Sequence, residues 1–143
     1  MTTQQPPPIY QQIVQEDAKV SLPWVLFFQQ TYDGDAGTVW EPNFVNLSEV
    51  GSPTITGRYY RLTKYLTFFH VNITPATSTS STAGTTYIDN YPVNFTNDGF
   101  CIAVSGGAGS SGGHITSSNN RIFTPEWVTV TIPLTIIGIG EAQ

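Results

Sequence analysis

Charged residues are scarce in this sequence. Only 10% of its 143 residues are Asp, Glu, Lys or Arg, against roughly 25% in an average soluble protein. The basic residues are Lys19, Arg58, Arg61, Lys64 and Arg121, and the net charge is −5. No basic stripe is present that would follow a phosphate backbone, so we expect no nucleic-acid partner.

Only one cysteine is present, and long apolar runs are missing. The single cysteine, Cys101, excludes an internal disulfide, and its neighbours Phe100, Ile102 and Val104 predict a small buried side chain rather than a reactive thiol. No apolar stretch approaches the ~20 residues that span a membrane. Residues 1–8 are polar and proline-rich, unlike a signal peptide. We therefore expect no membrane partner.

Patterns that bind metals or form nucleophilic dyads are absent as well. The Asp33-Gly34-Asp35 segment sets two carboxylates close together, but the next residues supply none of the further oxygen ligands that a calcium loop needs. Cys101, His70 and His114 lie in no recognisable catalytic context. We expect His70 to make a cross-strand hydrogen bond, and His114 to face solvent or another subunit.

Glycoside cleavage would need two paired carboxylates. The acids available for it fall at turns and strand ends without a distinguishing pattern: Glu41, Glu49, Asp89, Asp98 and Glu126. The sequence therefore predicts a protein that is not an enzyme and that holds no cofactor or metal.

Thr, Ser, Asn and Gly are abundant, and from Thr38 onward apolar residues recur with period two. This pattern predicts an all-β body, an antiparallel β-sandwich of short strands. The expected strands are Thr38–Leu47, Pro53–Leu62, Tyr65–Thr74, Thr85–Val93, Phe100–Val104, His114–Ser117 and Val128–Ile137. The low-complexity stretches 77–86 and 105–113 are expected to be loops.

Two of these strands carry more specific predictions. Tyr65–Thr74 begins with apolar residues on both faces, which places it centrally or under another subunit, with Tyr65, Phe68 and Phe69 as subunit contacts. Pro133 lies inside the last strand, which predicts an edge position or an interrupted ladder.

The chain divides into three parts. Residues 1–20 are predicted to form an extended docking arm, whose contacts are Pro6, Pro7, Pro8, Ile9 and Tyr10. Residues 21–37 are predicted to form one short helix and a linker, because Ser21 can cap a helix and Pro23 sits early in it. The helix would dock through Trp24, Phe27 and Phe28. Residues 38–143 form the body.

Several segments carry a family resemblance. They are the run from Ser21 to Gln29, the run Gly34-Asp35-Ala36-Gly37-Thr38-Val39-Trp40-Glu41-Pro42-Asn43-Phe44, the hairpin start Gly57-Arg58-Tyr59-Tyr60-Arg61, residues 73–87 and the run from Asn119 to Trp127. Together they resemble small virion proteins of tailed bacteriophages. The resemblance implies a jelly-roll-like β-sandwich body, usually trimeric, fastened to the particle by an N-terminal segment. It brings no catalytic residue with it.

On this basis we expect a non-enzymatic phage virion protein, assembled in the bacterial cytoplasm, whose partners are copies of itself and other tail or capsid proteins. The favoured position is a trimeric, tail-fibre-like appendage or adaptor; the alternative is a capsid decoration protein. A host-glycan-binding module is the alternative from another class, and a polysaccharide depolymerase is a weaker rival. Aromatic rings that could stack on sugars are Trp24, Trp40, Trp127, Tyr59, Tyr60, Tyr87 and Tyr91.

Overall fold

The computed structural model describes residues 37–105 and 108–143, and every regular element in these ranges is a β-strand. The strands are β1 (Thr38–Trp40), β2 (Phe44–Val45), β3 (Ser48–Val50), β4 (Thr54–Arg61), β5 (Leu66–Thr74), β6 (Ser78–Ser81), β7 (Tyr87–Ile88), β8 (Gly99–Ser105), β9 (Ala108–Thr116), β10 (Arg121–Phe123), β11 (Trp127–Val130) and β12 (Leu134–Glu141). The predicted all-β class is confirmed for this part of the chain. The predicted arm and helix lie outside the described residues.

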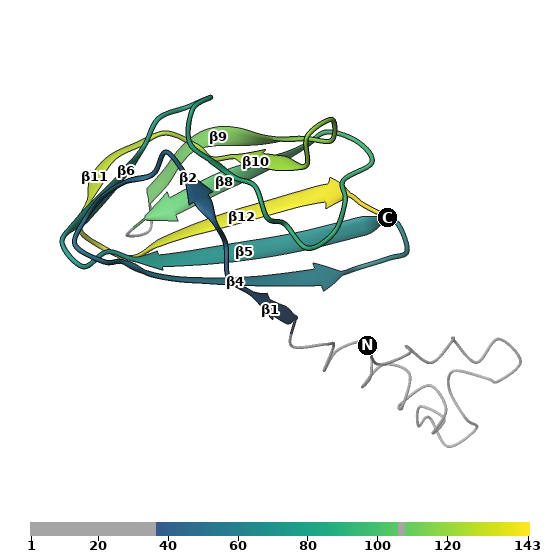
Figure 1. Cartoon of the computed structure of the whole chain (residues 1–143), viewed down its shortest axis with the longest axis horizontal. Helices are drawn as coiled ribbons and strands as arrows, with labels where there is room; N and C mark the ends of the chain where they lie inside the picture. Colours follow the sequence, from purple (N-terminus) through teal and green to yellow (C-terminus); the bar gives the residue numbers. More distant parts are fainter. Residues whose placement is uncertain (1–36, 106–107) are drawn as a thin grey trace, which may run out of the picture. The chain divides into compact units, whose positions relative to one another are not determined.

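Nine strands form one antiparallel sheet, in the order β1-β4-β5-β12-β8-β9-β10-β7-β2. The two edge strands, β1 and β2, are separated in sequence only by residues 41–43. Such a short connection requires the sheet to curl until its two edges approach each other. Figure 1 shows the long strands β4, β5 and β12 side by side on one side of this curl, and β9, β10 and β2 on the other.

Asn90 connects the two edges of the large sheet where they approach each other, a place that we call the seam. Its Nδ2 donates to the Glu41 carbonyl oxygen at 2.7 Å, and its Oδ1 accepts from the Asn43 backbone N–H at 2.8 Å. The same Oδ1 accepts from the Trp40 indole N–H at 3.4 Å. One side chain therefore holds the β1–β2 connection against the loop that follows β7.

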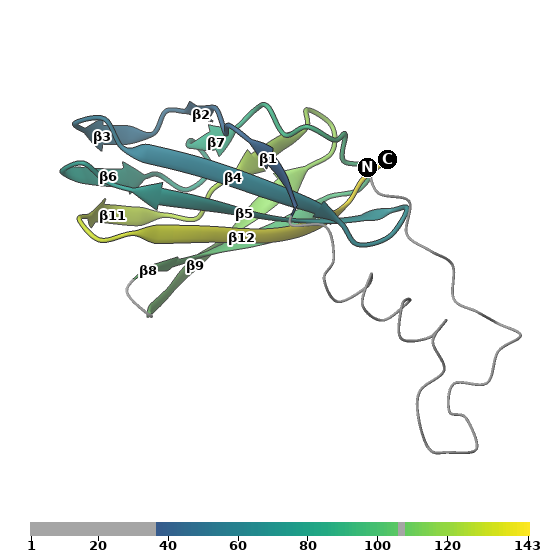
Figure 2. The same cartoon turned by 90° about the horizontal axis from the view of Figure 1, so that it is seen from below.

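The strands β11, β6 and β3 form a second, three-stranded sheet, at one end of the body in Figure 2. Although β6 reads Ser-Thr-Ser-Ser, the side chains of Thr79 and Ser81 are buried. The Trp127 indole N–H donates to Thr79 Oγ1 at 3.3 Å, and Ser81 Oγ lies 2.7 Å from Thr124 Oγ1. These hydrogen bonds offset the cost of burying hydroxyl groups.

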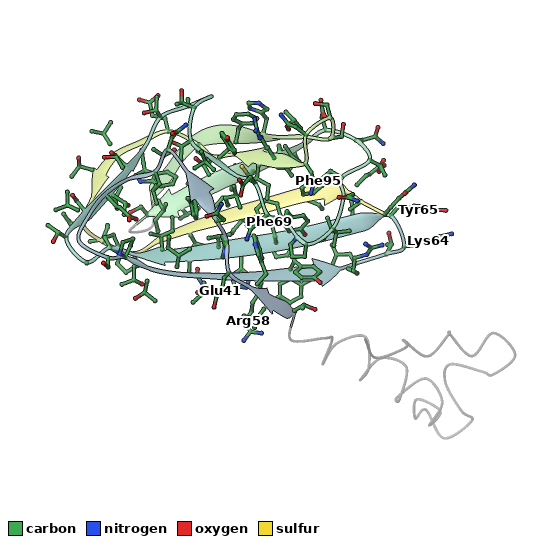
Figure 3. All side chains as sticks on the ribbon, in the orientation of Figure 1. Glu41, Arg58, Lys64, Tyr65, Phe69 and Phe95 are labelled. Atoms are coloured by element: carbon green, nitrogen blue, oxygen red, sulfur yellow. The ribbon has the colours of Figure 1, made fainter. Side chains whose placement is uncertain are left out.

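The core lies inside the curled sheet. Figure 3 shows Phe69 and Phe95 there, and Tyr91 stacks on the ring of Phe95 with centroids 4.6 Å apart. Trp40 packs edge-on against Tyr91 at 5.2 Å and against Phe69 at 6.3 Å. Because these rings fill the space under β12, that strand carries Gly138 where a side chain would collide with Phe69.

The predicted strands at 53–62, 65–74 and 100–104 are confirmed as β4, β5 and β8. The two predicted loops are wrong in part, because 77–86 contains β6, and β9 begins at Ala108 inside 105–113. The predicted strand Val128–Ile137 is split into β11 and β12 around Pro133, so the expected interruption is confirmed.

Other predicted bounds also need correction. The expected strand Thr38–Leu47 is two short strands, because the chain crosses the seam between them. Of Thr85–Val93 only Tyr87–Ile88 is a strand. Two further strands, β3 and β10, were not predicted, since each has only three residues and too few positions to show a period.

Candidate functional site: the outer face of the sheet

Alternation along the strands separates two sets of side chains in the large sheet. One set points into the curl and is fully buried: Phe69 and Val71 on β5, Cys101 on β8 and Ile136 on β12. Successive side chains of a strand point to opposite faces. Their neighbours in sequence therefore point outward, and these neighbours are also largely apolar.

The strand registers align the outward side chains in two rows that run across the sheet. The first row is Tyr60, Phe68, Ile139 and Phe100, on β4, β5, β12 and β8. The second row is Val39, Arg58, His70, Ile137 and Ile102, on β1, β4, β5, β12 and β8. We call these nine side chains the outer face.

Much of the outer face is open to solvent. Val39 is 61% exposed, Phe100 60% and Ile102 43%. Tyr60, Phe68, Ile137 and Ile139 are half-buried, because they shield one another. Large contiguous apolar patches are uncommon on monomers and mark sites of association.

Arg58 and His70 are the only basic residues in the two rows, and no carboxylate stands in them. Figure 3 shows the Arg58 side chain projecting from the body. The outer face is thus almost uncharged, which suits an equally apolar partner better than a charged one.

The first row continues across the rest of the sheet as aromatic rings. His114 stands opposite Phe100, Phe123 opposite His114 and Tyr87 opposite Phe123. The His114 and Phe123 rings stack with centroids 4.8 Å apart, and the Arg121 guanidinium lies 4.2 Å from the Tyr87 ring centroid. His114 is exposed, in agreement with the prediction that it faces solvent or another subunit.

Of the predicted subunit contacts, two are accessible. Tyr65 is 59% exposed at the turn between β4 and β5, where the Lys64 ammonium lies 5.2 Å from its ring, and Phe68 is on the outer face. Phe69 has no exposed surface and packs against Trp40 and Tyr91, so the prediction that it contacts another subunit is wrong. Side chains alternate along the strand, and Phe69 points inward.

The predicted docking residues of the arm and helix lie outside the described residues. They are Pro6 to Tyr10, Trp24, Phe27 and Phe28.

The sequence analysis does not single out the outward residues of β8 and β12. It treats Phe100 and Ile102 only as apolar neighbours of a buried Cys101. The signal was available, since Phe100–Val104 is apolar at both alternating positions, as the start of β5 is. A strand that is apolar on both faces needs cover on both faces.

A shallow hollow of about 350 Å³ lies at the end of the outer face where β12 ends and β8 begins. It is lined by Leu66, Asn97, Asp98, Gly99, Phe100, Ile139, Gly140 and Glu141. Asn97 Nδ2 donates to Glu141 Oε2, and Asp98 accepts from the Ser117 backbone N–H and hydroxyl at 2.8 and 2.9 Å. An exposed ring thus stands beside two carboxylates and a carboxamide.

Hydrogen bonds from Ser117, the backbone one first, lower the pKa of Asp98, so it stays ionised at neutral pH and is a poor general acid. Elsewhere, Cys101 is buried as predicted, and this burial raises the pKa of its thiol to about 12.

Among residues 37–105 and 108–143, no group of three or more His, Cys, Asp or Glu side chains is placed to hold a metal ion. The same ranges contain no helix with the length and hydropathy of a membrane span.

The aromatic residues considered for sugar stacking separate into two groups. Trp40, Trp127 and Tyr91 are buried and present no face to a ligand. Tyr60 and Tyr87 are half-buried in the outward row, and Tyr59 packs between Trp40 and Tyr91.

Comparison of the chain with protein-family models, with curated proteins and with solved structures finds no significant match. The resemblance to tailed-phage virion proteins therefore stays a prediction.

Proposed function

We propose that this protein is a non-enzymatic structural subunit that associates with copies of itself through the outer face. The observation that carries the proposal is the apolar outer face itself, which leaves Phe100, Ile102 and Val39 open to water in the isolated chain. Apolar surface is stabilised by about 25 cal/mol for each Å² removed from water. An exposed Phe100 alone then contributes about 3 kcal/mol when covered.

The whole outward side of the five strands, of which the outer face is the apolar part, approaches the size of an interface between proteins. Strands β4, β5 and β12 have 8, 9 and 8 residues, and a strand of that length spans about 27 Å. Five strands at about 4.8 Å spacing are about 24 Å wide, so the sheet offers roughly 650 Å² to a partner. A standard interface takes about 800 Å² from each side.

A second copy is the partner that fits best. The outer face has no carboxylates in its two rows and gives a charged partner little to pair with. Another copy brings the same nearly uncharged surface. Within this proposal the chain forms a homotrimer with a jelly-roll-like body, as the family resemblance implies. Its place is a tail-associated appendage of a phage particle, anchored by residues 1–20, with capsid decoration as the alternative.

The test compares variants that differ in where an apolar side chain is removed. In sedimentation velocity, the double variant Phe100→Ser/Ile102→Ser should sediment as a monomer while the wild type sediments as a trimer. Val128→Ser is the matched control, because Val128 is 79% exposed but lies on the small sheet, and it should keep the trimer. A double variant that still sediments like the wild type would contradict the proposal.

The hollow beside Phe100 favours a second candidate, the glycan-binding module. Sugars are held by an aromatic ring under the apolar side of the pyranose and by carboxylate and amide groups on its hydroxyls. Phe100, Glu141 and Asn97 supply these groups. A glycan array probed with the wild type tests it: binding abolished by Glu141→Ala supports this candidate, and the absence of any bound glycan counts against it.

A further inference from the structure

The turn between β4 and β5, residues 62–65, carries two exposed apolar side chains and one cation. Leu62 and Tyr65 are each more than half exposed, and the Lys64 ammonium lies over the Tyr65 ring. Figure 3 shows Lys64 and Tyr65 projecting from this end of the body. None of the three belongs to the nine residues of the outer face, so cover of the two rows alone leaves them in water.

Hydrogen bonds hold this turn in one shape. The backbone N–H groups of Leu62 and Thr63 donate to the Leu66 carbonyl oxygen at 2.9 and 3.3 Å. Thr63 Oγ1 accepts from the Leu66 backbone N–H at 3.1 Å, and Arg61 Nη2 donates to the Lys64 carbonyl oxygen at 2.8 Å. A segment that is already fixed loses less conformational freedom when it binds.

The hollow at the same end of the sheet has the complementary chemistry. Its wall contains the exposed ring of Phe100 and the carboxylates of Asp98 and Glu141. Both hydrogen bonds from Ser117 go to Oδ1 of Asp98, and the Asn97 carboxamide donates to Oε2 of Glu141. Each carboxylate has a second oxygen that can accept a hydrogen bond from a cation.

We propose that the β4–β5 turn of one copy docks into the hollow of the next copy, with Lys64 on the carboxylates of Glu141 and Asp98 and Tyr65 against Phe100. This inference rests on the proposed self-association and names its contact at one end of the outer face. Opposite charges that meet across an interface fix its register.

The area of the interface favours this contact. The outward side of the five strands offers roughly 650 Å², and a standard interface takes about 800 Å² from each side. The turn lies beyond the ends of β4 and β5, so its surface is not counted in that area. A docked turn adds Leu62 and Tyr65 to the apolar surface that association removes from water.

The placement of the two patches suits a ring of copies. Leu66 pairs with Glu141 between β5 and β12, and Ile139 pairs with Phe100 between β12 and β8, so the turn and the hollow lie at the same end of the strands. A rotation about an axis parallel to the strands keeps every residue at its height along that axis. Each contact in a closed ring joins two different patches, here a turn and a hollow.

Charge reversal tests the docking by sedimentation velocity of the full chain at a series of concentrations. The variants are Lys64→Glu, Glu141→Lys and the double variant with both changes. Both side chains are exposed, so the variants should fold. The matched control is Glu49→Lys, which makes the same change of charge as Glu141→Lys at an exposed position of β3 on the small sheet.

Each single reversal replaces an attraction by a repulsion, which should weaken one contact about tenfold. Three contacts then lower the constant for assembling three chains about a thousandfold, which raises the concentration of half-assembly about thirtyfold, its square root. The double variant should assemble like the wild type. A mixture of the two single variants should assemble better than either alone, because the reversed turn of one chain meets the reversed hollow of the other. Glu49→Lys should assemble like the wild type.

Four results would overturn the docking while leaving the proposed function in place. They are single reversals that assemble like the wild type, an equal loss in Glu49→Lys, a mixture that assembles no better than its components, and an assembled wild type that binds a glycan through Glu141. The third result would mean that Lys64 and Glu141 interact within one chain. A wild type that is monomeric at every concentration would instead overturn the proposed function, and the docking with it.

Discussion

Gly138 on β12 is the position where the fit of sheet and core can be tested most directly. A Cβ atom at Gly138 would overlap Phe69 Cζ, would lie 2.6 Å from Phe69 Cε1 and 3.0 Å from Cys101 Cβ. Non-bonded carbons pack at about 3.5–4.0 Å, so the Phe69 ring would have to move by about 1 Å. Trp40 and Tyr91 stand behind that ring, with centroids 6.3 and 5.4 Å away, and leave it no free direction.

Gly138→Ala should therefore cost the upper part of the usual range for overpacking, about 3 kcal/mol of the free energy of unfolding. In a body of this size that lowers Tm by roughly 15 °C. The matched control is Gly112→Ala on β9, where an added Cβ meets only Cys101 O at 3.8 Å. Urea unfolding followed by tryptophan fluorescence measures both. A loss below about 1 kcal/mol for Gly138→Ala, or an equal loss for both variants, would refute this account of the core.

Two further predictions concern the side chain of Asn90 at the seam and the buried phenol of Tyr91. Asn90→Ala should lower the free energy of unfolding by about 2 kcal/mol, because three hydrogen bonds to the β1–β2 connection are lost. The control is Asn97→Ala, which removes one exposed hydrogen bond. In the same urea titration it should lower the free energy of unfolding by less than about 1 kcal/mol. Burial raises the pKa of the Tyr91 phenol from 10.0 to about 12, so the unfolded chain loses that proton first and stability should fall between pH 10 and pH 12 by about 3 kcal/mol. Tyr91→Phe should flatten this fall when urea unfolding is repeated at pH 9 and pH 11, and an unchanged slope would show that another group causes it.

The sequence was sufficient for three of the long strands, β4, β5 and β8, and for part of the site. In β4, β5 and β8 the pattern of apolar residues extends over enough positions to predict a strand. Cys101 lies among apolar neighbours and was predicted to be buried, as it is. Tyr65, at the turn between β4 and β5, and the outward Phe68 were predicted as contacts. The reason is that the segment that starts β5 is apolar on both faces.

The rest depends on contacts between distant segments. Thr79 and Ser81 are buried in β6 only because Trp127 and Thr124 provide partners more than 40 residues away, and a run of hydroxyl residues taken alone reads as a loop. Phe69 and Phe68 are equally apolar, and only the register with β4 and β12 decides which of them points into the core. The outer face needs five strands side by side, which a single strand's pattern does not predict.

The most direct test of the central claim is the mass of the wild-type chain in solution at neutral pH, measured by size-exclusion chromatography with multi-angle light scattering at tens of micromolar. One chain has a mass of 15.6 kDa. The outer face predicts association between identical chains, and the family resemblance implies three of them, so the proposal predicts a species of three chains that persists on dilution into the low micromolar range. A single peak at the mass of one chain across that range would contradict it.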